Sequence, residues 1–195
     1  MLRDYFNKQA EIWDKTASET DSAKLAKLAA QIELNPGDVV LDVGTGTGVF
    51  LPYIMQRIGT QGHIYALDIA EKMLAKAQQK YLQNNIKFIC GSVEEIPLSA
   101  NTCNSVICYS SFPHFRDKQQ ALHEMKRVLK KGGLLFIGHT SSREHINHIH
   151  SHHEVTVHDL LPDAVEMTQL LSSTGFIGVK VAETPDSYVA MGRKI

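Results

Sequence analysis

The sequence predicts one α/β domain built on a mostly parallel sheet, and three observations support this prediction. Short apolar segments typical of strands alternate with amphipathic segments typical of helices, which is the order of successive β-α-β units. A glycine-rich turn directly follows the first strand-like segment, between Val39 and Gly48. The last two strand-like segments are separated by a short Glu-Thr-Pro-Asp turn, so at least one of them runs antiparallel to the others. A length of 195 residues fits a single domain over 1–195.

Two helices are expected before the first strand, within an N-terminal segment over residues 1–35. The first runs from Leu2 to about Asp14 and is rich in aromatic residues. Two interpretations of it remain open: a lid over a ligand, or an ordinary packing segment. The lid interpretation uses Tyr5, Phe6 and Trp13. The second helix, expected between residues 21 and 34, has apolar residues at helical spacing and should pack on the sheet: Leu25, Leu28, Ala29 and Ile32.

The first strand and its turn have the pattern of a nucleotide-type ligand site. The strand is the apolar, β-branched run that begins at Val39, typical of the centre of a parallel sheet. Glycines then alternate with threonines, and glycine allows positive φ and close approach of a ligand to backbone N–H groups. A helix is expected over Val49–Ile58, so the turn should offer the free N–H donors of a helix N-terminus.

The second strand is expected over His63–Asp68. Asp68 ends it, 24 residues after Gly44. An acidic side chain at this point can accept hydrogen bonds from both ribose hydroxyls of a nucleotide. The alternative is an N-cap, because a helical pattern follows directly. The distance from the glycine turn favours the ribose role.

The remaining segments continue the alternation. Further strands are expected at Ile86–Cys90, Asn104–Ser110, Leu134–His139, Phe176–Ala182 and Ser187–Lys194. Helices are expected over Arg116–Lys130, ended by a Gly-Gly pair, and over Pro162–Ser173.

Composition narrows the classes of partner. The formal net charge is -1 without a basic block, which argues against nucleic acid as the main partner. No apolar run approaches membrane-spanning length and the N-terminus lacks the apolar core of a signal peptide, so we expect a cytoplasmic protein with no membrane partner. Cys90, Cys103 and Cys108 lie in apolar runs and are expected to be reduced core thiols.

Three stretches, taken together, resemble the class I S-adenosylmethionine-dependent methyltransferases of the small methyltransferase-11 type. Val-Leu-Asp-Val-Gly-Thr-Gly-Thr-Gly at 40–48 resembles their first motif, with Gly-x-Gly-x-Gly rather than Gly-x-Gly-x-x-Gly spacing. Ala-Leu-Asp-Ile-Ala-Glu-Lys-Met-Leu at 66–74 resembles their second-strand motif. His-Glu-Met-Lys-Arg-Val-Leu-Lys-Lys-Gly-Gly-Leu-Leu at 123–135 resembles the signature of their fifth strand and the helix before it. The segment 6–14 is similar to their N-terminal Phe…Trp-Asp segment.

The resemblance implies a Rossmann-like, seven-stranded sheet in the order 3-2-1-4-5-7-6, with strand 7 antiparallel, helices on both faces and an N-terminal helical lid. It implies S-adenosyl-L-methionine as the cofactor. The implied contacts are Asp42 near the amine, Gly44, Thr45, Gly46 and Gly48 at the methionine part, Asp68 on the ribose, Ile69, Ser92 and Val93 at the adenine, and Tyr109 next to the methyl group. Ser92 departs from the family, which often has Asp there, and Glu94 is a candidate substitute.

The sequence contains ten histidines, and most of them come after the donor motifs. The stretch within 140–160 is the densest and is interpreted as an insertion over the active site. On a helix, His145, His148 and His152 share one face, whereas His150 points toward the side of Ile146. A polar exposed helix, a metal site and a substrate pocket are the three interpretations left open, although the spacing matches no standard zinc module.

The methyl acceptor is expected to be a small molecule that meets residues from three segments. We predict that His114, His139 and His150 face it, as a proton-accepting base or as ligands of a divalent metal, and that Phe112 helps to enclose it. The rival functions are a nicotinamide-dependent oxidoreductase, disfavoured by the glycine spacing, and a metal- or metal-cofactor-binding protein that uses the His-rich segment. The motifs bind the donor, so they leave the acceptor atom and the oligomeric state open.

Overall fold

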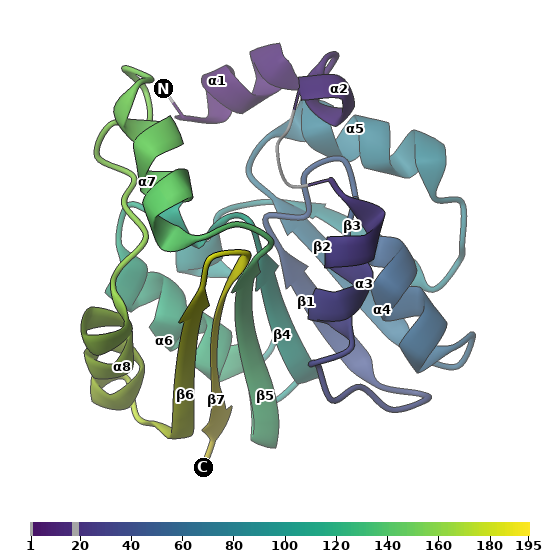
Figure 1. The fold of residues 1–195 in the computed structure, drawn as a ribbon. Helices are drawn as coiled ribbons and strands as arrows, with labels where there is room; N and C mark the ends of the chain where they lie inside the picture. Colours follow the sequence, from purple (N-terminus) through teal and green to yellow (C-terminus); the bar gives the residue numbers. More distant parts are fainter. Residues whose placement is uncertain (1, 17–19) are drawn as a thin grey trace.

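A computed structural model describes residues 2–16 and 20–195 and shows a seven-stranded sheet in the order β3-β2-β1-β4-β5-β7-β6 (Figure 1). Neighbouring strands pair in parallel from β3 to β5, and β7 is antiparallel to both β5 and β6. This confirms the predicted order and the antiparallel strand 7. The strands are β1 Val39–Val43, β2 His63–Asp68, β3 Ile86–Cys90, β4 Cys103–Tyr109, β5 Leu129–His139, β6 Phe176–Thr184 and β7 Ser187–Lys194.

Helices cover both faces of the sheet, as predicted (Figure 1). The helices are α1 Leu2–Gln9, α2 Trp13–Thr16, α3 Ser22–Ala29, α4 Leu51–Ile58, α5 Glu71–Lys80, α6 Lys118–Val128, α7 Arg143–Ser151 and α8 Ala164–Ser173. Side-chain oxygens of Asp21, Asp117, Ser142 and Asp163 accept backbone N–H groups at the starts of α3, α6, α7 and α8. None of the described helices is long and apolar enough to cross a membrane.

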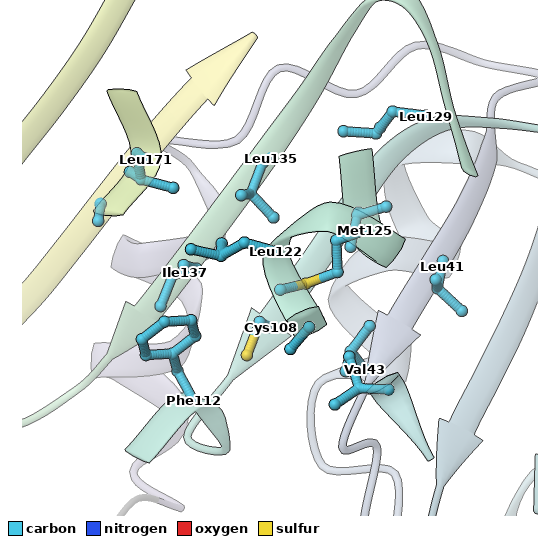
Figure 2. Close-up of a cluster of buried hydrophobic side chains, with 14 of the residues drawn as sticks. Leu41, Val43, Cys108, Phe112, Leu122, Met125, Leu129, Leu135, Ile137 and Leu171 are labelled. Carbon is cyan, nitrogen blue, oxygen red and sulfur yellow. The ribbon is translucent and has the colours of Figure 1, made fainter. Parts of the chain in front are cut away.

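The sheet is buried between two apolar layers. Helices α3 and α4 pack on one face, where Leu25, Leu28 and Ile54 are almost fully buried. Helices α6 and α8 pack on the other face, and Figure 2 shows Leu122 and Met125 of α6 over the strands. Burying side chains of this size contributes roughly 1.5–3 kcal/mol each. Because the two layers pack on both faces of the sheet, they hold in place the strand ends that carry the site residues.

Several element boundaries differ from the sequence prediction by one or two residues, and three differences change an interpretation. The first predicted helix divides into α1 and α2, and α4 begins at Leu51 rather than Val49. Strand β5 begins at Leu129, ahead of the Gly-Gly pair, because Leu129 already pairs with Cys103 of β4 before a register shift. The glycines therefore lie inside an irregular strand instead of ending the helix.

The N-terminal helices lie across the C-terminal ends of the parallel strands (Figure 1). Arg3 Nε is 2.9 Å from Glu71 Oε2, and Lys76 Nζ is 2.6 Å from Glu11 Oε2. Phe6 and Trp13 pack on a small cluster that includes Met73 of α5. Residues 1 and 17–19 of the predicted 1–35 segment lie outside the described residues.

Candidate active site

A cavity of about 700 Å³ lies at the C-terminal ends of β1, β2, β4 and β5. Ligands bind at this edge in open α/β sheets, next to the point where the strand order reverses. Its wall combines the glycine turn, the strand ends, α1, α2 and α7. The volume falls in the range of about 300–1,000 Å³ that is typical of small-molecule sites.

Two glycines of the turn are required by close packing. Gly44 has φ +69°, and a Cβ there would lie 2.4 Å from Ser111 Cβ. Ser111 cannot retreat easily, because its Oγ donates to the Val43 carbonyl at 2.8 Å. Gly48 has φ +83°, and its Cβ would lie 2.6 Å from the Tyr81 ring. Gly48 is not among the residues that line the cavity, and its contact with the donor stays a prediction.

The backbone N–H groups of the turn are largely consumed within the protein. Gly44 N and Thr45 N both donate to the Leu67 carbonyl, at 2.8 and 3.0 Å. Gly46 N donates to Asp68 Oδ2 at 2.8 Å, and Gly48 N to the Thr45 carbonyl at 2.8 Å. The predicted row of free N–H donors is therefore wrong at these four positions. A pyrophosphate site needs such donors, so the turn is poorly suited to a dinucleotide.

Two carboxyl groups flank the turn instead. Asp42 is 1% exposed at the end of β1, and its Oδ2 has no hydrogen-bond partner among the described residues. Burial raises the pKa of Asp42 to about 7; the Thr45 hydroxyl offsets part of this effect and Asp68 adds to it. Burial likewise raises the pKa of Asp68 to about 6, against the opposing hydrogen bonds from Ala70 and Gly46.

Asp68 accepts two backbone hydrogen bonds at the end of β2, and its ribose role stays a prediction. Its Oδ1 accepts from Ala70 N at 2.8 Å just before α5, while Oδ2 accepts from Gly46 N in the glycine turn. The N-cap of α5 is Ala70, without a side-chain capping bond, so the N-cap alternative for Asp68 is not supported. Each carboxylate oxygen has a second lone pair, so both can still accept from a ligand hydroxyl. The residues predicted at the adenine end also line the cavity: Ile69, Ser92 and Val93. The Ser92 hydroxyl accepts from Glu94 N at 3.2 Å and so starts the short 3-10 turn Val93–Glu95.

Tyr109 lines the cavity at the end of β4. Its ring stacks on Phe50 at 4.8 Å between centroids, and its hydroxyl lies 2.8 Å from Thr140 Oγ1. The next residue, Ser110, has φ +53°, which is a strained conformation for a residue other than glycine.

The three predicted histidines line the same cavity. The rings of His114 and His150 lie 4.8 Å apart, and His139 is 1% exposed at the end of β5. Phe6 lies 5.1 Å from the His114 ring and 5.6 Å from that of Trp13. Burial, followed by the neighbouring His114, lowers the pKa of His150.

A methyltransferase domain family matches residues 41–137, the segment from β1 to β5 that carries the glycine turn and both carboxyls. The chain belongs to the class I S-adenosylmethionine-dependent methyltransferases. This methyltransferase is 26% identical to a malonyl-[acyl-carrier protein] O-methyltransferase of Marinomonas sp., over 97% of this chain and 74% of the relative. It is 35% identical to a ubiquinone/menaquinone biosynthesis C-methyltransferase of Blochmanniella floridana, over 56% of this chain and 45% of the relative.

The fold agrees with that of solved methyltransferases. A SAM-dependent methyltransferase from Aquifex aeolicus superimposes with a TM-score of 0.76 at 24% identity. The match covers 97% of this chain and 98% of the other. The chain spans less than half the length of the quinone-pathway relative. The comparisons therefore establish its fold and family, whereas its acceptor has to be inferred from its own residues.

One predicted residue of the methyltransferase and the predicted metal role need correction. Phe112 is fully buried and does not line the cavity. Figure 2 shows it among the core side chains Cys108 and Ile137, so its predicted contact with the acceptor is wrong. The metal role is not supported either. Within residues 2–16 and 20–195, no three His, Cys, Asp or Glu side chains are grouped to hold a metal ion.

The His-rich segment forms α7, and its residues divide between two faces. His145, His148 and His152 are exposed, which fits the polar-helix interpretation for that face. His150 lies with Ile146 and Ile149 on the cavity side. Sequence reasoning missed Phe50, Thr140 and Asp159, the first two of which contact Tyr109. No motif marks them, because each is defined by a contact between distant segments.

Proposed function

We propose that this methyltransferase transfers the methyl group of S-adenosylmethionine to a small-molecule acceptor. The observation that carries the proposal is the pair Asp42 and Asp68 beside a glycine turn whose N–H groups are already bonded. Such a site favours an ammonium group and hydroxyls over phosphates. The geometry of the turn and the glycine spacing therefore both argue against a nicotinamide dinucleotide as the ligand.

The chain offers a fitting partner for each part of the donor. The buried Asp42 oxygen that has no partner among the described residues would accept from the donor's ammonium group, and Asp68 would accept from the ribose hydroxyls. Ile69 and Val93 would pack against adenine, while Gly44 and Gly46 would permit close approach of the methionine part. When bound, this donor supplies an electrophilic methyl group on a sulfonium, so the protein has mainly to align the acceptor and exclude water.

The acceptor end lies under the N-terminal helices. Tyr5, Phe6 and Trp13 line it from the lid, with His114 and His150 beside them. An enclosed wall of this kind suits a compact molecule. The curated relatives are named for O-methyl transfer to a malonyl-carrier protein and for C-methyl transfer in quinone biosynthesis, so their names agree on the donor and differ in the acceptor.

Donor binding is tested by calorimetric titration with S-adenosylhomocysteine, the product form of the donor, and separately with NADH. We expect binding of the first only. Asp68→Asn should weaken it about 10- to 100-fold, the equivalent of one charged hydrogen bond. Asp186→Asn, at an exposed hairpin position, is the matched control and should bind normally. Tight binding of NADH without binding of S-adenosylhomocysteine would overturn the proposal.

Methyl transfer is tested with S-adenosylmethionine that carries a deuterated methyl group. The enzyme is incubated with a small-molecule extract, and mass spectrometry identifies products that gain the label. Alanine variants of His114, His139 and His150 should lose turnover while keeping their affinity for S-adenosylhomocysteine within a few-fold. Labelling of protein or RNA alone, with no labelled small molecule, would contradict a small-molecule acceptor.

A further inference from the structure

The Asp159 carboxylate contacts His114, one of the predicted acceptor histidines, and no motif predicts it. It lies between α7 and α8, and its Oδ2 is 2.8 Å from Nδ1 of His114, 45 residues earlier in the chain. The two side chains are 21% and 13% exposed. The contact is thus largely shielded from bulk water, where a charge-assisted hydrogen bond is stronger than at the surface.

The segment that carries Asp159 is fixed by α7. Asn147 accepts from Leu161 N at 2.8 Å and donates to the Leu161 carbonyl at 3.1 Å. His150 Nδ1 lies 2.5 Å from the Asp159 carbonyl, and Thr156 Oγ1 donates to the His150 carbonyl at 3.2 Å. Because these bonds fold the segment back onto α7, the Asp159 carboxylate is held in position by main-chain contacts independent of His114.

The partners of the two histidines define their tautomers. A carboxylate and a carbonyl oxygen only accept, so His114 and His150 each donate through Nδ1–H. In a neutral ring the other nitrogen, Nε2, is then an acceptor. Within the described part of the chain, no protein group hydrogen-bonds Nε2 of either ring. Both rings line the cavity, so each Nε2 is available to a ligand.

An aromatic wall encloses this pair. The rings of Trp13, Phe6, His114 and His150 follow one another at 5.6, 5.1 and 4.8 Å between centroids. Ile146 and Ile149 line the cavity from α7. An acceptor bound here meets apolar surface and few waters, so a proton released on methylation needs a protein group to receive it.

We propose that Asp159 is a positioning residue that holds His114 as the proton acceptor, and that the acceptor molecule carries its nucleophile as a hydroxyl, a thiol or a ring N–H. This inference rests on the proposed methyl transfer. His114 is the catalytic residue, and Asp159 acts through it by fixing the tautomer and stabilising the charged ring. The Nδ1 atom of His150 is held by the neutral Asp159 carbonyl, and its Nε2 atom hydrogen-bonds the acceptor.

The step balances without a further reactant. The bond between the acceptor atom and its hydrogen breaks, and its electron pair forms the new bond to the methyl carbon. The bond between that carbon and sulfur breaks, and its pair remains on sulfur. The proton moves to Nε2 of His114 and passes to water when the product leaves.

The first test reads the tautomer directly. Nitrogen NMR of protein with ¹⁵N-labelled histidine, saturated with S-adenosylhomocysteine, should show His114 protonated at Nδ1 and bare at Nε2. Asp159→Ala should shift the ring toward the Nε2–H form, and Asp159→Glu should restore part of the original signal. The Asp159→Ala change leaves the main-chain contact to His150 in place, so the His150 signal serves as an internal reference. Wild-type His114 protonated at Nε2 would overturn the proposal.

The second test measures turnover with defined probes. Catechol and 2-mercaptoethanol lose a proton when methylated, whereas pyridine and dimethyl sulfide do not. Those acceptors that are methylated should come from the first group. On them, His114→Gln and Asp159→Ala should lower kcat about 10²- to 10⁴-fold, with Asp159→Glu in between and affinity for S-adenosylhomocysteine unchanged. His148→Gln, on the exposed face of α7, is the matched control and should keep full turnover.

The outcomes separate this inference from the proposed function. Methylation of pyridine or dimethyl sulfide at the rate of the other probes would overturn the inference and leave methyl transfer standing. Full turnover by Asp159→Ala would do the same. If wild-type protein methylates neither the probes nor any small molecule of the extract, the proposed function fails, and the tautomer measurement still decides whether Asp159 positions His114.

Discussion

Replacing Asp42 by asparagine should stabilise the ligand-free protein at neutral pH, although we propose that Asp42 binds the donor. The side chain is 1% exposed at the end of β1, and one of its oxygens has no partner among the described residues. Desolvation therefore makes the ionised form of Asp42 unfavourable in the folded state. Asparagine has the same shape but no charge, so it avoids this penalty.

The size and the sign of the effect follow from the pKa. Burial raises the pKa of Asp42 from 3.8 to about 7. At 1.36 kcal/mol per pH unit, this difference is worth up to about 4 kcal/mol. Because the folded-state pKa is raised, the group's contribution is favourable below about pH 4 and is lost as the pH rises to about 7. Asp42→Asn should match wild type near pH 4 and exceed it by about 2–4 kcal/mol near pH 8.

Urea unfolding followed by circular dichroism, at several pH values between about 4 and 8, measures this difference. Asp186→Asn on the exposed hairpin controls for the loss of one charge. A wild-type-minus-variant difference that stays constant across the pH range would refute the reasoning. With S-adenosylhomocysteine the order should reverse at pH 8, because the ligand's ammonium group pairs with ionised Asp42. Its affinity for wild type should fall below about pH 6–7, as Asp42 and then Asp68 become protonated.

Three further predictions concern packing and the lid. Gly48→Ala should cost more than about 2 kcal/mol in urea unfolding, because it adds a clash with Tyr81 to the strain of positive φ. Gly37→Ala, with φ +86° and open space around it, should cost only about 1–2 kcal/mol, and an equal loss in both variants would contradict the clash. Phe112→Ala should lower the free energy of unfolding by about 3–5 kcal/mol, and the folded variant should keep its affinity for S-adenosylhomocysteine. A selective loss of affinity would show that Phe112 contributes to the binding site. Asp14→Asn should speed release of S-adenosylhomocysteine about 3- to 10-fold in stopped-flow experiments, because it weakens the contacts of Asp14 with the glycine turn and α5; unchanged release would exclude a lid role.

The donor half of the site was largely predictable from the sequence. Asp42, the glycine turn and Asp68 lie within one β-α-β unit, and short-range patterns define each of its parts. The close packing of Gly44 against Ser111 was not predictable, because Ser111 follows a strand that is distant in the sequence. The same holds for the N–H groups of Gly44, Thr45 and Gly46, because their partners on β2 come more than twenty residues later.

The acceptor half was predictable only in outline. The positions of His114 and His139 at strand ends placed them at the ligand-binding edge, and helical spacing separated His150 from the exposed histidines of α7. Phe112 has the same kind of position in the sequence as His114 but points into the core, because the short turn that carries both residues presents them to opposite environments.

Residues a few positions apart specify the alternation of strands and helices, the glycine turn and the carboxyl groups around it, so these features can be read from the sequence. The folded chain was needed to show which N–H groups are bonded, which loop side chains face the cavity, and that Asp159 contacts His114. These contacts join segments tens of residues apart. Their distances depend on how α7 and the following segment pack on the sheet, which no local pattern encodes.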